Sequence, residues 1–297
     1  MFTGLSAFPL TPLVYDRVDE RAFVDLVGRL DSAGVDSIGA LGSTGSYAYL
    51  SRAERARVAQ LAVESAGATP VIVGIGGLRT RHVLEHADDA QEAGASAVLL
   101  APLSYQTLTD DDVFGLFHDV TRHLSVPLVV YENPVMTRFT FSDELYEAIG
   151  GLPGVGSVKI PGVPVDPADA TARVRRLREA LPSSASIGVS GDAFGAAGLA
   201  AGCDAWYSAI AGTIPGPALE ITRAARSGDT ARAAELSARL QPLWDLFATY
   251  GSLRVIAAVA ESLGLVGPAS LPLPIRGLDL DTRAHVRRVI DELDLRR

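Results

Sequence analysis

The chain has 297 residues, of which 48% are hydrophobic and 21% charged, so it can bury the core of one large α/β domain. The formal net charge of −9 argues against nucleic acid as a partner. No apolar run reaches the roughly 18 residues of a membrane span, and no basic segment precedes the apolar N-terminal stretch, so we expect neither a membrane partner nor a signal peptide. The single cysteine, Cys203, excludes an intrachain disulfide and suits a cytoplasmic location. We expect it to be a small buried residue rather than a nucleophile.

Short apolar runs, each followed by an amphipathic stretch, recur through the first 210 residues. Phe23, Leu26, Val27 and Leu30 have helical spacing in the first such stretch, and Ser51 with Glu54 forms a capping box at the start of the second. Continuous apolar runs are typical of parallel strands that are buried on both faces. Eight strand–helix units favour a (β/α)8 TIM barrel, with a doubly wound open sheet as the alternative. The predicted strands are residues 3–8, 35–41, 70–75, 97–101, 127–131, 155–160, 186–190 and 205–210.

No strand pattern follows residue 217 or so. Helical patterns cover about residues 217–227, 230–248, 253–263 and 282–293, and a segment rich in proline and glycine precedes the last of them. We therefore expect residues 1–222 to form the barrel and residues 223–297 to form a C-terminal helical region packed on it.

Lys159 is the only lysine in the chain, and the other 25 of the 26 basic residues are arginine. Arginine can replace lysine on a surface, but not where an amine must lose its proton and attack a carbonyl. Lys159 also lies near the end of the sixth predicted strand, and barrel enzymes place their active sites at these strand ends. We interpret it as an imine-forming nucleophile. The alternative is an interior lysine paired with a carboxylate.

Two further strand ends carry groups suited to the same site. Tyr131 ends the fifth strand, where its phenol could move protons during imine chemistry or could simply pack in the core. Ser43 and Thr44 lie between two glycines after the second strand, where a tight loop could hold a carboxylate or form an ordinary turn.

Other motifs predict no cofactor site. The glycines at 74, 76 and 77 lack the spacing of a dinucleotide fingerprint and indicate a tight turn. His82 and His86 share a helix face, but helical placement puts them outside the barrel, so we expect no metal site. The substrate itself is expected to be held covalently, without a cofactor.

Taken together, these motifs resemble those of the dihydrodipicolinate synthase / N-acetylneuraminate lyase family of class I aldolases. The resemblance extends over nearly the whole chain. Its most specific elements are the G-S-T-G loop with the L-S-R-A-E-R run that follows, the Y-E-N-P motif that ends strand five, the lysine of strand six, and the segment G-V-S-G-D beginning at Gly188.

The resemblance implies roles for individual residues. Lys159 would form the Schiff base with a 2-oxo acid, and Tyr131 would shuttle protons in a hydroxyl relay with Ser43. Ser43 and Thr44 would bind the substrate carboxylate. The same comparison implies that Tyr105 is donated across a dimer interface of a homotetramer. Substrate would also lie against Gly188 and the backbone around Tyr207.

Several departures from the family pattern fall in the part of the site that receives the second substrate. Glu132 replaces the usual asparagine, and Met136 stands where dihydrodipicolinate synthases place an arginine, with Arg138 two residues later. Ile160-Pro161-Gly162 replaces the usual acidic and small residues after the lysine, and Ser46 replaces a common glutamate. We therefore expect a lyase or aldolase that acts on pyruvate or a pyruvate-derived 2-oxo acid, by C–C cleavage, condensation or dehydration. The alternatives are 4-hydroxy-tetrahydrodipicolinate synthase itself and a non-catalytic barrel that binds a 2-oxo acid.

Overall fold

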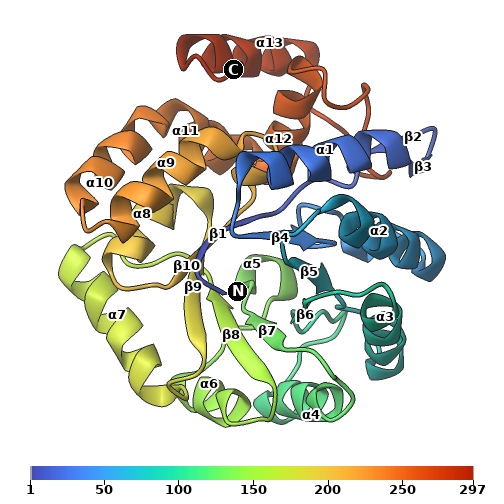
Figure 1. Cartoon of the computed structure of the whole chain (residues 1–297), viewed down its shortest axis with the longest axis vertical. Coiled ribbons are helices and arrows are strands. Elements are labelled where there is room, and N and C mark those ends of the chain that lie inside the picture. Colours follow the sequence, from blue (N-terminus) through green and yellow to red (C-terminus); the bar gives the residue numbers. More distant parts are fainter. Residues whose placement is uncertain (1, 297) are drawn as a thin grey trace.

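The computed structural model describes residues 2–296, and within them eight parallel strands close into a barrel (Figure 1). The strands follow one another around the barrel in chain order, and β1 closes it by pairing with both β10 and β4. The (β/α)8 prediction is confirmed, and each of the eight predicted runs contains one strand. The strands are β1 (Gly4–Ala7), β4 (Ser37–Ala40), β5 (Val71–Gly74), β6 (Ala97–Leu100), β7 (Leu128–Tyr131), β8 (Val155–Ile160), β9 (Ser186–Ser190) and β10 (Ala205–Ser208).

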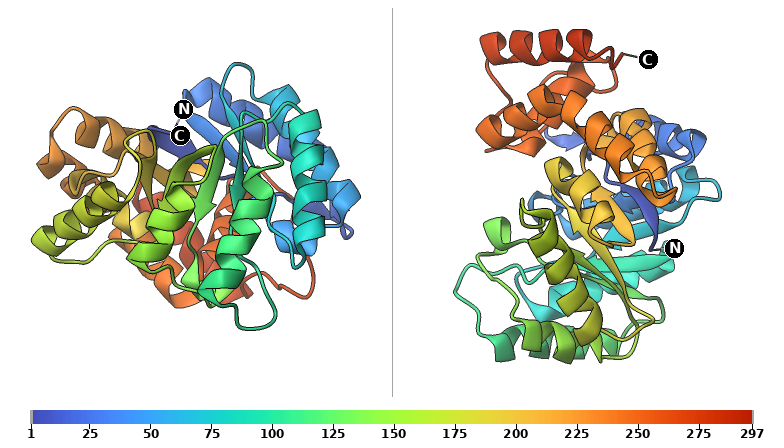
Figure 2. Two further views of the ribbon diagram at one scale, coloured as in Figure 1. Left: turned by 90° about the horizontal axis from the view of Figure 1, so that it is seen from below. Right: turned by 90° about the vertical axis from the view of Figure 1, so that its left-hand side faces the viewer.

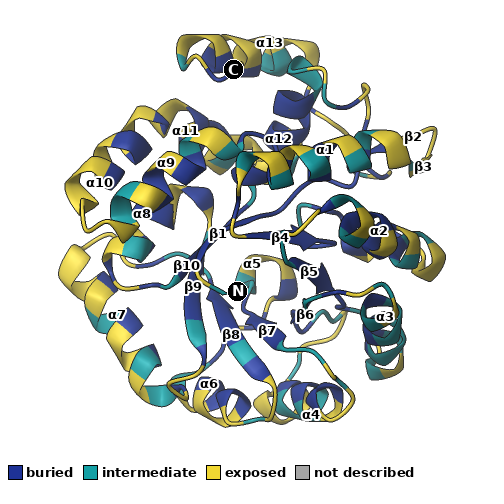
Figure 3. Cartoon of the chain, in the orientation of Figure 1, coloured by how far each residue is buried: buried dark blue, intermediate teal, exposed yellow. Residues whose placement is uncertain are grey.

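Helices surround the barrel, with their buried sides toward the strands and their exposed sides toward solvent (Figure 3). Two apolar clusters result: a large one between strands and helices, and a smaller one inside the barrel that includes Phe8, Val129, Tyr131 and Tyr207. The helices between strands are α1 (Glu20–Ala33), α2 (Arg52–Ser65), α3 (Thr80–Glu92), α4 (Asp110–Thr121), α5 (Pro134–Thr137), α6 (Asp143–Gly150), α7 (Pro167–Ala180) and α8 (Gly195–Ala200). Short 3-10 turns cover Tyr47–Tyr49, Asp192–Phe194 and Ile210–Gly212.

The C-terminal part of the chain is helical, as predicted. It contains α9 (Pro215–Arg226), α10 (Thr230–Arg239), α11 (Gln241–Tyr250), α12 (Ser252–Ser262) and α13 (Leu280–Glu292). Helix α13 lies at the periphery, against α11 and α12 (Figure 2). The boundary predicted between residues 222 and 223 falls within α9.

Two local predictions differ from the structure. The single helix expected over residues 230–248 is two helices, because Leu240 ends α10 and Pro242 in the first turn of α11 lacks the N–H that a continuous helix needs. A hairpin of β2 (Leu13–Val14) and β3 (Arg17–Val18) precedes α1 and was not predicted. None of the helices among residues 2–296 has the length and apolarity of a membrane span.

Candidate active site

Lys159 lies inside the barrel on β8, beside Tyr131 of β7 and Gly188 of β9 in the strand register. The residue has only 5% of its surface exposed. The Nζ atom lies 4.0 Å from the ring centroids of both Phe8 and Tyr131, and 5.7 Å from that of Tyr207. The amine is therefore enclosed by aromatic rings from three different strand ends.

Burial lowers the pKa of Lys159 from its ordinary 10.5 to about 7, although the negative charge of Asp192 acts in the opposite direction. Aromatic faces also favour the charged form, but they replace only part of the hydration that an ammonium loses. Near neutral pH about half of the amine is therefore unprotonated. An unprotonated amine is the form that adds to a carbonyl.

The Phe8 ring reaches the amine because two glycines leave space for it. A Cβ at Gly39 would lie 2.4 Å from the ring, and one at Gly42 would lie 2.6 Å from it. The ring also packs edge-on to Tyr207, with centroids 6.0 Å apart. Phe8 thus packs against the Lys159 amine, a role that was not predicted from the sequence.

The Tyr131 hydroxyl takes part in a small polar cluster at the end of β7. Side chains of Ser43 and Asn133 both hydrogen-bond to it, and the Asn133 Nδ2 donates at 2.9 Å. The same Nδ2 donates to the Ser43 Oγ at 3.3 Å. Burial raises the pKa of Tyr131 to about 12, and the bonds from Ser43 and Asn133 act against that rise.

Ser43 and Thr44 lie in the loop that follows β4, and both are half-buried. The loop turns sharply, because Leu41 and Ser46 both have left-handed backbones with φ of 56° and 54°. The Ser43 hydroxyl hydrogen-bonds with the side chains of Tyr131 and Asn133. The Thr44 hydroxyl forms no hydrogen bond with any residue in the described range 2–296, so it is available to a ligand.

Glu132 points away from this cluster. Its carboxylate is buried and accepts hydrogen bonds from the Tyr146 hydroxyl at 2.5 Å and from the Phe141 backbone N–H at 3.0 Å. Successive residues at a strand end face opposite sides, which puts Tyr131 and Asn133 on the barrel side and Glu132 against α6. Glu132 therefore ties the chain around α6 to the end of β7.

Met136 and Arg138 lie on the short helix α5 and at its end. Met136 is 65% exposed. Arg138 is also exposed, has a left-handed backbone with φ of 55°, and makes no side-chain hydrogen bond or ion pair within residues 2–296. Both side chains are therefore exposed to solvent on the segment that follows β7.

The structure does not bring Tyr105 to Lys159 within one chain. Tyr105 lies on the loop between β6 and α4 and is 88% exposed. Its expected role across a dimer interface stays a prediction.

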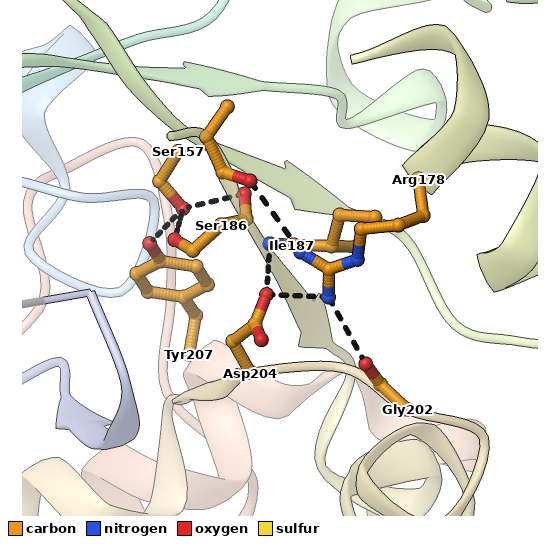
Figure 4. Close-up of polar contacts among 8 residues, drawn as sticks. Ser157, Arg178, Ser186, Ile187, Gly202, Asp204 and Tyr207 are labelled. Carbon is orange, nitrogen blue, oxygen red and sulfur yellow. Dashed lines mark hydrogen bonds and ion pairs between the residues drawn. The ribbon is translucent and has the colours of Figure 1, made fainter. Parts of the chain in front are cut away.

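Tyr207 and Gly188 are packed against each other. A Cβ at Gly188 would lie 2.2 Å from the Tyr207 ring, so the glycine provides room for that ring. The Tyr207 hydroxyl lies 2.7 Å from the Ser157 Oγ, which also accepts from the Ser186 hydroxyl at 2.8 Å (Figure 4). Ser157 precedes Lys159 by two residues, so the Tyr207 phenol is engaged one layer below the amine. The predicted substrate contacts of Tyr207 and Gly188 stay predictions.

Asp192 is a buried carboxylate that the sequence motif contained but to which no role was assigned. Its oxygens accept hydrogen bonds from the Ser208 hydroxyl at 2.7 Å and from the backbone N–H groups of Ala209 and Ile210 at 3.1 and 3.0 Å. It therefore fixes the turn after β10. Its charge also interacts with that of Lys159.

Two groups that could suggest other chemistry have ordinary surroundings. Cys203 is buried, and burial raises the pKa of its thiol to about 12, as expected for an unreactive core cysteine. Within residues 2–296 no cluster of three or more His, Cys, Asp or Glu side chains could hold a metal ion.

Comparison with known proteins gives one consistent result. Residues 1–293 match the model of the dihydrodipicolinate synthetase family. A 4-hydroxy-tetrahydrodipicolinate synthase of Halorhodospira halophila is 31% identical over 99% of this chain and 98% of its own length. The crystal structure of a dihydrodipicolinate synthase from Agrobacterium tumefaciens superposes with a TM-score of 0.94 at 44% identity, covering 98% of each chain. A putative dihydrodipicolinate synthetase from Pseudomonas aeruginosa has a TM-score of 0.91 at 27% identity, covering 99% of this chain and all of its own.

Proposed function

Because the chain belongs to the dihydrodipicolinate synthetase family and is a lyase of the class I aldolase type, we propose that it forms an imine between Lys159 and pyruvate or a pyruvate-derived 2-oxo acid. The observation that carries the assignment of Lys159 is its amine, buried among aromatic rings with a pKa of about 7 and facing Tyr131. No other lysine exists in the chain to form the imine.

The reaction begins with addition of the free amine to C2 of the 2-oxo acid. The carbonyl oxygen leaves as water, and both protons of the amine end in that water. Tyr131 carries these protons, because its hydroxyl is hydrogen-bonded to Ser43 and because the residue is paired with Lys159 on the neighbouring strand. The Thr44 hydroxyl and the N–H groups of its loop hold the carboxylate. Protonation of the imine nitrogen and loss of a C3 proton then give the enamine, whose C3 carbon forms the bond to an aldehyde; in the cleavage direction, breaking that bond leaves the same enamine.

The features beyond the imine bear on the choice of second substrate. Glu132 is occupied by Tyr146 and Phe141, and the exposed Met136 offers no charge to a carboxylate. These features favour an aldehyde other than aspartate semialdehyde, including a sugar-derived one. A second candidate is 4-hydroxy-tetrahydrodipicolinate synthase activity, favoured by the named relatives and by Arg138 at the end of α5, which has no ion-pair partner among residues 2–296.

Reductive trapping tests the imine. Incubation with pyruvate and borohydride should add the mass of reduced pyruvate to the peptide that contains Lys159. Lys159→Arg is the control, because a guanidinium fills the position but cannot form an imine, and it should take up no label. Absence of the adduct from the wild-type peptide would contradict the proposal.

A panel of aldehydes with pyruvate, and of 2-oxo acids assayed for pyruvate release, identifies the partner. Turnover with aspartate semialdehyde alone would favour the second candidate. Imine formation without turnover of any compound would favour a non-catalytic barrel.

We further propose a homotetramer in which Tyr105 completes a neighbouring site. Analytical ultracentrifugation of the wild type and Tyr105→Ala tests this, with a monomer as the contradicting result.

A further inference from the structure

We propose that Asn133 is a positioning residue that directs proton transfer by Tyr131. The inference rests on the proposed imine chemistry at Lys159. Asn133 is the only asparagine in the chain, and its Nδ2 donates to the hydroxyl oxygens of both Tyr131 and Ser43. One amide group thus connects the two hydroxyls of the relay.

The local backbone turns the Asn133 side chain toward the barrel. Asn133 occupies the cap position of α5, where an asparagine usually accepts a bond from the first turn, yet its side chain makes no capping bond. Pro134 follows it and has no N–H to offer. The Asn133 carbonyl accepts hydrogen bonds from the Thr137 hydroxyl and N–H, both at 2.9 Å, which holds the residue in place.

The amide group of Asn133 restricts the route that protons can take between the two hydroxyls. Amide Nδ2 is only a donor, so it cannot take the proton of Tyr131 or of Ser43. Those protons are left to pass between the two hydroxyls and the substrate. When Tyr131 releases its proton, Asn133 donates to the resulting phenolate, and hydrogen bonds to charged groups are the stronger ones. The deeply buried phenol therefore becomes a better acid at the moment it must act.

The influences on the pKa of Tyr131 show why a second hydrogen-bond donor is needed beside its hydroxyl. Burial raises the pKa of Tyr131 to about 12, and the nearby phenol of Tyr47 raises it further. Within residues 2–296 the hydrogen bonds that oppose this rise come from Ser43 and Asn133. Removing Asn133 leaves Ser43 as the remaining hydrogen-bond donor to the phenolate in the described part of the chain.

The test measures exchange of the pyruvate methyl protons with D2O by NMR, because exchange requires the imine to lose and regain a C3 proton. Variants are Asn133→Leu, which has similar bulk and no donor, and Asn133→Asp, which has the same shape and an ionisable acceptor. Gln60→Glu, an amide-to-carboxylate change on the exposed face of α2, controls for added charge. Borohydride trapping on each protein reports imine formation separately, and circular dichroism reports folding.

We expect exchange at pH 8 to be about 10- to 100-fold slower in Asn133→Leu, as for loss of a hydrogen bond to a charged group. Asn133→Asp should be slower still, because an ionised carboxylate beside the phenol opposes the phenolate. Both variants should still trap pyruvate, and Gln60→Glu should match the wild type.

A structural role for Asn133 gives the reverse order, because aspartate is the closer replacement in shape. Asn133→Asp exchanging as fast as Asn133→Leu, or faster, would overturn the inference. If Asn133→Leu does not fold, Asn133→Ala takes its place in the same comparison. Failure of the wild type to trap pyruvate overturns the proposed function instead, so the two failures are distinguishable.

Discussion

Replacing Lys159 with methionine should make the protein more stable at neutral pH while abolishing imine formation. Methionine keeps the length and apolar character of the side chain but carries no charge that needs hydration. In the folded protein the pKa of Lys159 is about 7, against the ordinary 10.5 that applies to the unfolded chain. Between these two values the unfolded state binds more protons than the folded state, so the wild type gains stability as pH rises from 7 toward 10.5.

The magnitude follows from the difference between the two pKa values. One pKa unit corresponds to about 1.36 kcal/mol, so complete protonation in the folded state costs about 5 kcal/mol. At pH 7 about half of the folded molecules have already lost the proton, and about 4 kcal/mol remains. At pH 9 only about 2 kcal/mol remains. Lys159→Met should recover these amounts.

Guanidinium unfolding of wild type and Lys159→Met at one protein concentration, at pH 7 and at pH 9, measures both free energies of unfolding. The decisive quantity is the change of the stability difference with pH, because packing of methionine contributes equally at both values. We expect it to fall by about 2 kcal/mol from pH 7 to pH 9. A stability difference that does not change with pH would refute the reasoning, as would a methionine variant that is less stable at pH 7.

Three further predictions concern neighbouring groups. Tyr131→Phe should still bind 2-oxo acid but slow imine trapping by about 100-fold or more, the usual range for loss of a proton-transferring group; a rate within threefold of wild type, by quenched-flow trapping, would count against it. Asp192→Asn removes the negative charge that raises the pKa of Lys159, so the midpoint of the trapping rate against pH should move below about 7; an upward movement would contradict this. Burial raises the pKa of Cys203 to about 12, so a thiol reagent at pH 8 should label the unfolded chain and not the native one, as mass spectrometry can check.

The sequence was sufficient to predict the barrel, since eight continuous apolar runs each contain an observed strand. The sequence also predicted that Lys159, Tyr131 and Ser43 lie at one end of the barrel, because the C-terminal ends of parallel barrel strands lie at the same end. The β2–β3 hairpin escaped prediction because its strands have two residues each and its turn residues, Tyr15 and Asp16, are not the Asn-Gly or Asp-Gly pair typical of two-residue hairpins. The break between α10 and α11 did carry a sequence signal, because a proline at position 242 cannot continue a helix.

The site could be predicted only in part, because side-chain direction depends on contacts between distant segments. Glu132 and Asn133 are adjacent, yet one is buried against α6 and the other bridges Tyr131 and Ser43. The Phe8 ring reaches Lys159 because glycines on β4 and in the loop after it leave the ring room. For Asn133 a signal was present, since a residue type used once in 297 positions stands out as Lys159 does.

The aromatic enclosure of Lys159 has a consequence for the newly made chain. Phe8 lies just after β1 and Tyr207 lies on β10, and these two strands meet only when the barrel closes. Before they pair, the amine lacks two of its three aromatic neighbours and is more hydrated, so its pKa lies closer to the ordinary 10.5. A partly assembled chain therefore has a lysine that is less reactive toward aldehydes and ketones. Pairing of β1 with β10 thus buries the amine and lowers its pKa in the same step.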